Sequence, residues 1–251
     1  MAPLSQPPLY QSGLGRTERK DLWWLQPFLV FIGLTSFALY STWAAFQGEN
    51  YEWGPYLSPF YSPLLLLNWW HWSPSFLILW IPLGFRGTCY YYRKAYYRSF
   101  FMDPPACAVG ELGESCYKGE TAFPFILQNL HRYFLIPASL LLVFLWHDVY
   151  NAFWFEGEFG IGVGTLILFF NTLFLSFYTL SCHSLRHLLG GKFDSFSCSK
   201  ARKICHKAWL GSTCLNAKHM LFAWISLFGV GLADLYVRLC AMGVIEDIRL
   251  L

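Results

Sequence analysis

The stretch that decides the architecture is Ser181-Cys182-His183-Ser184-Leu185-Arg186-His187, which closes a long apolar run. It holds three potential metal ligands within six residues. His183 and His187 are spaced i, i+4 and would share one face of a helix, with Cys182 about 100° round from His183. Polar groups at the end of a membrane span are costly, so they are expected to be functional. The stretch therefore predicts one wall of a redox-cofactor site in a membrane protein.

The composition is that of a chain which lies mostly inside a bilayer. Of its 251 residues 55% are hydrophobic and only 13% are charged, and the mean hydropathy is +0.37. Soluble domains carry roughly 25% charged residues. Aromatic residues reach 20%, as expected for helices with interfacial belts. We therefore predict an all-α integral membrane protein, with no nucleic acid among its partners.

Five apolar runs each reach the roughly 20 residues that a bilayer requires. They cover residues 22–46, 63–85, 123–150, 161–189 and 215–242, and the second could continue as a helix to residue 97. Residues 1–20 are polar and contain Pro3, Pro7 and Pro8, which predicts a mobile cytoplasmic tail. Residues 21–251 are then a five-helix transmembrane anchor domain.

Lysine and arginine are confined to two of the four loops between these runs, which predicts the orientation. The loops after spans 2 and 4 carry Arg86, Arg93, Lys94, Arg98, Lys118, Lys192, Lys200, Arg202, Lys203, Lys207 and Lys218. The loops at residues 47–62 and 151–160 contain no Lys or Arg. The N-terminus is therefore expected inside the cell and the C-terminus outside.

Four cytoplasmic span ends each offer one metal donor, so spans 2–5 are expected to form the cofactor-binding bundle. The donors are Cys89, His131, Cys182 and His219. Two cysteines and two histidines are the ligand set of a Rieske-type [2Fe–2S] cluster. A b-type haem instead needs two histidines on facing helices, available among His131, His183, His187 and His219. Each donor taken singly is more often a structural residue.

Further polar residues near the span ends are candidates for quinone binding. Asn129, Arg132 and Tyr133 at the inner end of span 3 could hold a quinone carbonyl. Asp148 and Asp234 lie towards the outer ends of spans 3 and 5. An ionisable residue at such a depth suggests an outer quinone pocket or proton exchange. The alternative is an interfacial carboxylate, with Asp234 paired to Arg238 at i, i+4.

Several motifs resemble the membrane-anchor (cytochrome b-type) subunit of mycobacterial-type succinate dehydrogenase, complex II. They are GTCYYYRKAYYRSF at 87–100, PPACAV at 104–109, YTLSCHS at 178–184, YSTW at 40–43 and SPFYSP at 58–63, with shorter matches at 127–133, 186–191 and 215–220. The resemblance covers most of the chain beyond residue 20.

This resemblance implies an anchor in the cell inner (plasma) membrane beneath a flavoprotein subunit and an iron–sulfur subunit on the cytoplasmic side. Electrons from succinate would reach a quinone, menaquinone by resemblance, through a membrane-embedded Rieske-type cluster, and this chain would not oxidise succinate itself. The implied ligands are Cys89, Cys182, His131 and His219, with His183 and His187 as substitutes. Two alternatives remain: an anchor carrying b haem, and a cofactor-free anchor that shapes the quinone site.

Overall fold

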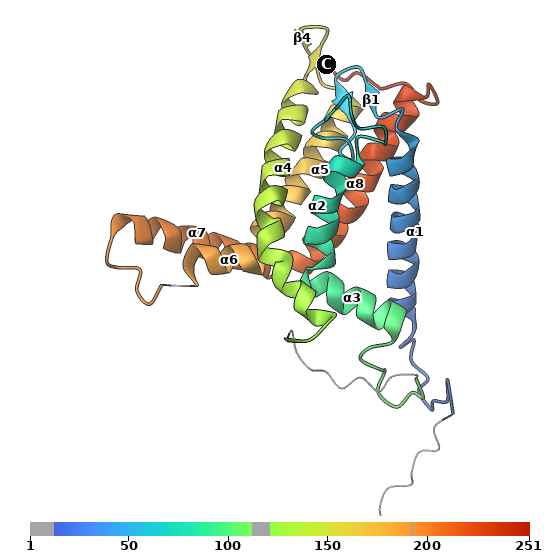
Figure 1. The fold of residues 1–251 in the computed structure, drawn as a ribbon, viewed down its shortest axis with the longest axis vertical. Coiled ribbons are helices and arrows are strands. Elements are labelled where there is room, and N and C mark those ends of the chain that lie inside the picture. Colours follow the sequence, from blue (N-terminus) through green and yellow to red (C-terminus); the bar gives the residue numbers. More distant parts are fainter. Residues whose placement is uncertain (1–12, 112–120, 192) are drawn as a thin grey trace, which may run out of the picture.

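The chain forms an upright bundle of helices, seen in the computed structural model in Figure 1. The structure describes residues 13–111, 121–191 and 193–251. The body of the bundle consists of α1 (Leu25–Gln47), α4 (His131–Asn151), α5 (Val163–Leu180) and α8 (His219–Ala241). The shorter α2 (Phe76–Gly87) packs beside α4, and a 3-10 helix, η2 (Phe125–Leu130), leads into α4. Residues 1–12 of the predicted tail lie outside the described part.

Smaller elements mark the two ends of the bundle (Figure 1). At one end α3 (Tyr90–Phe101) crosses towards α1, and α6 (His183–Gly190) and α7 (Lys200–Asn216) project sideways as a helical hairpin. At the other end lie two antiparallel hairpins, β1 (Glu52–Trp53) with β2 (Tyr56–Leu57) and β3 (Trp154–Phe155) with β4 (Glu158–Phe159). The C-terminus lies beside these hairpins, which makes this the end predicted to face outwards.

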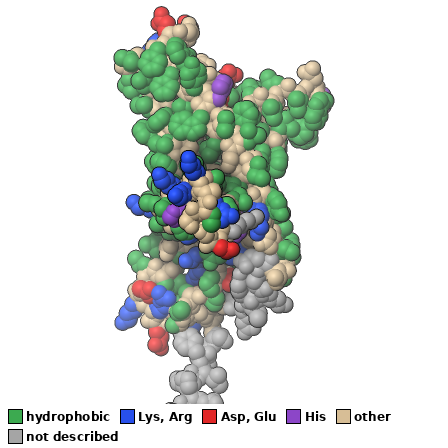
Figure 2. All heavy atoms as spheres, turned by 90° about the vertical axis from the view of Figure 1, so that its left-hand side faces the viewer, with side chains coloured by type: hydrophobic (Ala, Val, Ile, Leu, Met, Phe, Trp, Pro, Cys, Tyr) green, Lys and Arg blue, Asp and Glu red, His purple; other side chains and the backbone are tan. Residues whose placement is uncertain are grey.

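The bundle surface is apolar where lipid would touch it. Leu83, Ile136 and Val143 are 74%, 70% and 64% exposed, which would be costly in water. Figure 2 shows hydrophobic side chains over much of one face, with Lys and Arg gathered around the α6–α7 hairpin. The prediction of an all-α, multi-pass membrane protein is confirmed by this arrangement together with the length of the helices.

Small and polar residues let the central helices α5 and α8 pack closely. Near the middle of the two helices, a Cβ on Gly229 of α8 would lie 3.7 Å from Oδ1 of the buried Asn171 on α5. Small residues permit the close backbone approach that replaces the hydrophobic driving force within a bilayer. This seam fixes the end of α5 beside the start of α8, where two of the predicted donors lie.

Among the described residues, four helices are long and apolar enough to cross a membrane: Leu25–Gln47, Phe125–Asn151, Val163–Leu180 and His219–Ala241. The predicted second span is helical only from Phe76, so α2 has 12 residues, or roughly 18 Å at 1.5 Å per residue. Pro74 disfavours helical geometry at the residue before it, and the helix begins directly afterwards. A helical second span from residue 63 was therefore wrong, and a fifth crossing stays a prediction.

Three predicted spans also differ from continuous helices at the end of the bundle opposite the β-hairpins. The run at 161–189 breaks at Ser181-Cys182 into α5 and α6, and the extension of the second span to residue 97 breaks at Thr88-Cys89. The fifth span begins at His219 rather than at residue 215, because α7 ends at Asn216. Hydropathy alone does not register these breaks, since apolar residues continue through or close to them.

Candidate metal centre

The two cysteines occupy equivalent breaks between helices. Cys89 precedes α3 with φ −69° and ψ 130°, and Cys182 precedes α6 with φ −62° and ψ 132°. Each cysteine follows a hydroxyl residue, Thr88 or Ser181, that ends the preceding helix. The extended cysteine backbone turns the chain, so each thiol sits at the start of a new helix.

The two histidines are the first residues of α4 and α8, and each faces one of the thiols. His131 Nε2 lies 3.2 Å from Cys182 Sγ, and His219 Nε2 lies 3.6 Å from Cys89 Sγ. Cys89, Cys182 and His219 are each at most 2% exposed. Four donors from four helix starts therefore meet in a buried layer at one end of the bundle.

The hydroxyl groups next to the cysteines orient the imidazoles. Thr88 Oγ1 lies 3.1 Å from His131 Nδ1, and Ser181 Oγ lies 2.6 Å from His219 Nδ1. Thr88 donates its proton to the Gly84 carbonyl at 2.6 Å, and Ser181 donates to the Tyr178 carbonyl at 3.0 Å. Each hydroxyl oxygen therefore accepts from Nδ1–H, which assigns the tautomer and leaves the Nε2 lone pair free for a metal.

Aromatic rings back both imidazoles. Phe85 stacks on His131 with ring centroids 4.6 Å apart, and Tyr178 stacks on His219 at 5.0 Å. These rings shield the layer from water, and the cysteine Sγ and histidine Nε2 atoms remain as the metal donors.

The donor arrangement fits a two-metal group better than a single ion. In the part of the chain that the structure describes, no three His, Cys, Asp or Glu side chains gather closely enough to hold one metal ion. A Rieske-type cluster puts both thiolates on one iron and both imidazoles on the other, whereas the closest contacts here join a thiol to an imidazole. The two cysteines and two histidines therefore match a Rieske-type cluster in their number, type and closeness. The contacts do not match it in which two residues would share an iron.

A buried hydroxyl gives a second sign that the layer is built around a polar group. Tyr178 is 2% exposed and packs in the same cluster as Cys89 and Cys182, and the polar group beside its hydroxyl is the Cys89 thiol, a weak acceptor. A buried hydroxyl left with a weak acceptor gains less than one with a full hydrogen bond. The sulfur atoms of a cluster are acceptors that would make up this difference.

The substitute ligands are not part of the layer. His183 and His187 lie on α6 and are exposed, although His183 directly follows Cys182 in sequence. The extended backbone at Cys182 separates the two side chains, so the thiol is buried and His183 is not. Of the six candidate ligands, the structure brings together Cys89, Cys182, His131 and His219.

The inner quinone candidates surround the start of α4. Asn129 is exposed at the end of η2, and Arg132 and Tyr133 are exposed on the first turn of α4, next to His131. They lie beside the donor layer on the surface of the bundle. A role in quinone binding stays a prediction.

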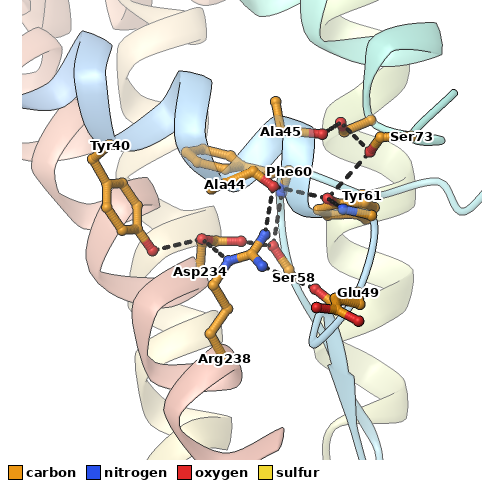
Figure 3. A network of polar contacts seen from close by, with 12 residues as sticks. Tyr40, Ala44, Ala45, Glu49, Ser58, Phe60, Tyr61, Ser73, Asp234 and Arg238 are labelled. Atoms are coloured by element: carbon orange, nitrogen blue, oxygen red, sulfur yellow. Dashed lines mark hydrogen bonds and ion pairs between the residues drawn. The ribbon is translucent and has the colours of Figure 1, made fainter. Parts of the chain in front are cut away.

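The outer candidates Asp148 and Asp234 lie at the opposite end and do not meet the donor layer. Asp148 accepts a hydrogen bond from Ser62. Asp234 is fully buried and accepts from Tyr40 at 2.6 Å, from Arg238 at 2.8 Å and from Ser58 (Figure 3). The i, i+4 pair expected with Arg238 is present. Quinone binding by these two carboxylates also stays a prediction.

Sequence reasoning missed the residues that surround the donors. Thr88, Ser181, Phe85 and Tyr178 orient or back the imidazoles, and none was a candidate. The signal that could have found the two hydroxyl residues is a repeated dipeptide, a hydroxyl residue followed by cysteine at the end of an apolar run. The aromatic backing leaves no such signal in a chain with 24 Phe and 15 Tyr.

The fold and the donor layer define a class, that of multi-pass helical membrane proteins with a buried Cys and His layer at one end. Residues 25–243 match the family described as actinobacterial succinate dehydrogenase subunit SdhC. The chain therefore belongs to this family and is a membrane-anchor subunit of succinate dehydrogenase.

A solved structure agrees with this assignment. The chain is similar to a chain of the Mycobacterium smegmatis Sdh1 complex in the apo form, with 41% sequence identity and a TM-score of 0.83. The match covers 100% of this chain and 98% of the other. No curated protein matches the sequence.

Proposed function

We propose that this subunit relays electrons from an iron–sulfur subunit to menaquinone through a membrane-embedded Rieske-type [2Fe–2S] cluster. The cluster would be held by Cys89, Cys182, His131 and His219. The observation that carries the proposal is that two buried thiols each face a histidine Nε2, at 3.6 and 3.2 Å, and that all four residues stand at helix starts at one end of the bundle. When bound, such a cluster supplies reversible one-electron transfer.

The chain's own residues supply the surroundings that such a relay needs. Thr88 and Ser181 hold the imidazoles with Nε2 directed at the thiols. Phe85 and Tyr178 cover the rings and exclude water. Asn129, Arg132 and Tyr133, exposed next to His131, would bind the quinone carbonyl close to the electron source.

The proposed partners are the flavoprotein and iron–sulfur subunits, docked on the cytoplasmic side of the inner membrane. This placement is supported by the basic residues of α3 and of the α6–α7 hairpin, which lie at the donor end of the bundle. The C-terminus and both β-hairpins would then face outwards.

A comparison of two buried cysteines tests the proposal. In the purified complex we expect two extra iron atoms and two acid-labile sulfides over the soluble subunits, and a Rieske-type electron paramagnetic signal after reduction. Cys182→Ser should abolish this signal. Cys240→Ser is the matched control, because Cys240 is 2% exposed but lies near the far end of α8.

Two results would refute the cluster. A positive pyridine haemochrome assay without the extra iron–sulfur would favour the b-haem anchor. Full quinone reduction by Cys182→Ser, with unchanged metal content, would favour an anchor that only shapes the quinone site.

A further inference from the structure

Arg86 places a guanidinium group at the edge of the donor layer. It lies in the last turn of α2 and donates hydrogen bonds to the Ala223 carbonyl at 3.1 Å and to Ser226 Oγ at 3.0 Å, both on α8. It also donates to the hydroxyl of Tyr92 on α3. Contacts to two other helices fix the position of this charge.

The charge lies close to the donors. The guanidinium carbon of Arg86 is 4.8 Å from the centroid of the Tyr178 ring, and Tyr178 stacks on His219 at 5.0 Å. One aromatic ring thus contacts both the cation and a proposed ligand. Cys89 follows Arg86 by three residues, and its backbone N–H donates to the Arg86 carbonyl at 3.1 Å.

No carboxylate neutralises this cation within the described residues. The ion pairs found there join Arg19 to Asp21, Arg98 to Glu111 and Arg238 to Asp234, besides a His147–Asp148 contact. The hydrogen-bond acceptors of Arg86 are neutral. An uncompensated charge in a site of low dielectric acts over a longer range than one in water.

We infer that Arg86 is a counter-charge that raises the reduction potential of the group held by the four donors. The inference rests on the proposed function. One-electron reduction of a [2Fe–2S] cluster there, by the iron–sulfur subunit of the proposed relay, would take one ferric iron to ferrous without breaking a bond and would add one negative charge to the layer. The fixed positive charge of Arg86 would stabilise that reduced state more than the oxidised state.

The test is a redox titration of the cluster signal in the assembled complex, with dithionite as reductant. Arg86→Gln should lower the ratio of reduced to oxidised cluster at a given potential at least tenfold, which is about 59 mV for one electron. Arg86→Lys keeps the charge but not the geometry of the hydrogen bonds, and should stay within threefold of the unaltered protein.

A second substitution keeps the test valid if Arg86→Gln fails to assemble. Ser226→Asp would place a carboxylate against the guanidinium and neutralise it without removing it, so it should shift the midpoint in the same direction. Unchanged midpoints in both Arg86→Gln and Ser226→Asp, or equal shifts in the Gln and Lys variants, would overturn the inference. A missing cluster signal in the unaltered complex would instead refute the proposed function.

Discussion

At the scale of single residues, the centre depends on two hydroxyl groups that already donate their protons to helix carbonyls. Ser181 donates to a helix carbonyl, so its oxygen can only accept from His219 Nδ1–H. Thr88 does the same for His131. In each hydroxyl–cysteine pair the hydroxyl contacts one imidazole and the adjacent thiol faces the other. Ser181 holds His219 while Cys182 faces His131, and Thr88 and Cys89 do the reverse.

Loss of the Ser181 hydroxyl should therefore weaken iron binding without unfolding the bundle. Partners that orient a ligating imidazole typically contribute 10–100-fold to metal affinity. We expect Ser181→Ala to lose iron to a chelator at least tenfold faster than the unaltered complex, and Ser181→Thr to restore most of the retention. Ser139→Ala is the control, since Ser139 also donates to a carbonyl of its own helix, that of Leu135, but lies away from the four donors. Equal retention in Ser181→Ala and Ser139→Ala would contradict the orienting role.

At the scale of elements, helix α2 is short but packed closely against α4. A Cβ on Gly84 would lie 2.2 Å from Cε1 of Phe134, so glycine is required for this contact. Near Gly87, three residues further on, nothing lies within 4 Å of a Cβ. The contact holds the end of α2, and with it Thr88 and Cys89, against the start of α4.

Gly84→Ala should consequently destabilise the bundle. Overpacking of a close contact typically costs about 1–3 kcal/mol, and a ring held between two helices has little room to move. Melting of the detergent-solubilised protein should occur at a lower temperature than in the unaltered chain. Gly87→Ala should melt at or slightly above the normal temperature, because alanine favours helix over glycine. Identical melting of both variants would show that α2 and α4 are not held by this contact.

The loop after α3 provides a pH-dependent connection. Arg98 donates to both carboxylate oxygens of Glu111, at 2.7 and 2.9 Å, and the hydrogen bond from Arg98 lowers the pKa of Glu111 below its usual value. A lowered folded-state pKa gives stability that is present above the unfolded pKa and is lost as the pH falls through the folded value.

We therefore expect amide protection of residues 102–111 to be full at pH 7 and to fall below about pH 4.5. The Arg98 and Glu111 side chains are 20% and 8% exposed, so water still screens the pair. A screened pair contributes up to about 1 kcal/mol, so exchange, corrected for its intrinsic pH dependence, should accelerate about fivefold. In Glu111→Gln the protection should be low at both pH values. A pH response that persists in Glu111→Gln would assign it to another group.

At the scale of the whole molecule, the two ends of the bundle do different things. Among the described residues, the donor end holds the Cys and His side chains and a cation, Arg86, that no carboxylate neutralises, whereas at the opposite end the buried charges of Asp234 and Arg238 pair with each other. Arg238 donates to the carbonyls of Ala44 and Glu49, both at 2.9 Å, as well as to Asp234 (Figure 3). This network joins α8 to the end of α1 and to the loop that carries Glu49 and Ser58, and it favours a structural role for Asp234.

Asp234→Ala should accordingly cost stability rather than quinone affinity. Removal of one partner of a buried ion pair typically costs about 3–5 kcal/mol, since it leaves the other charge unpaired. We expect a lower melting temperature, with unchanged iron content and quinone KM in the protein that remains folded. A raised quinone KM at normal stability would restore Asp234 to the quinone site.

Much of the protein could be predicted from sequence. Composition and apolar run length are local properties, so the membrane class and the approximate helix positions follow from them. The four donors also stand out, because Cys and His at span ends are conspicuous against an apolar background. The break at Pro74 was predictable in principle, since proline acts on its immediate neighbours.

The tertiary structure alone decided which donors meet and what surrounds them. Cys89 and His219 are 130 residues apart, and their contact depends on how α2 and α8 pack, which no local pattern encodes. The same holds for Arg86, which resembles any loop cation in sequence but is held by α8, and for His183, which lies beside Cys182 in sequence but away from the layer. Sequence determined which side chains were available, because chemistry belongs to single residues. Packing decided what these side chains do, because the site is formed by residues that are far apart in the sequence and meet only in the folded chain.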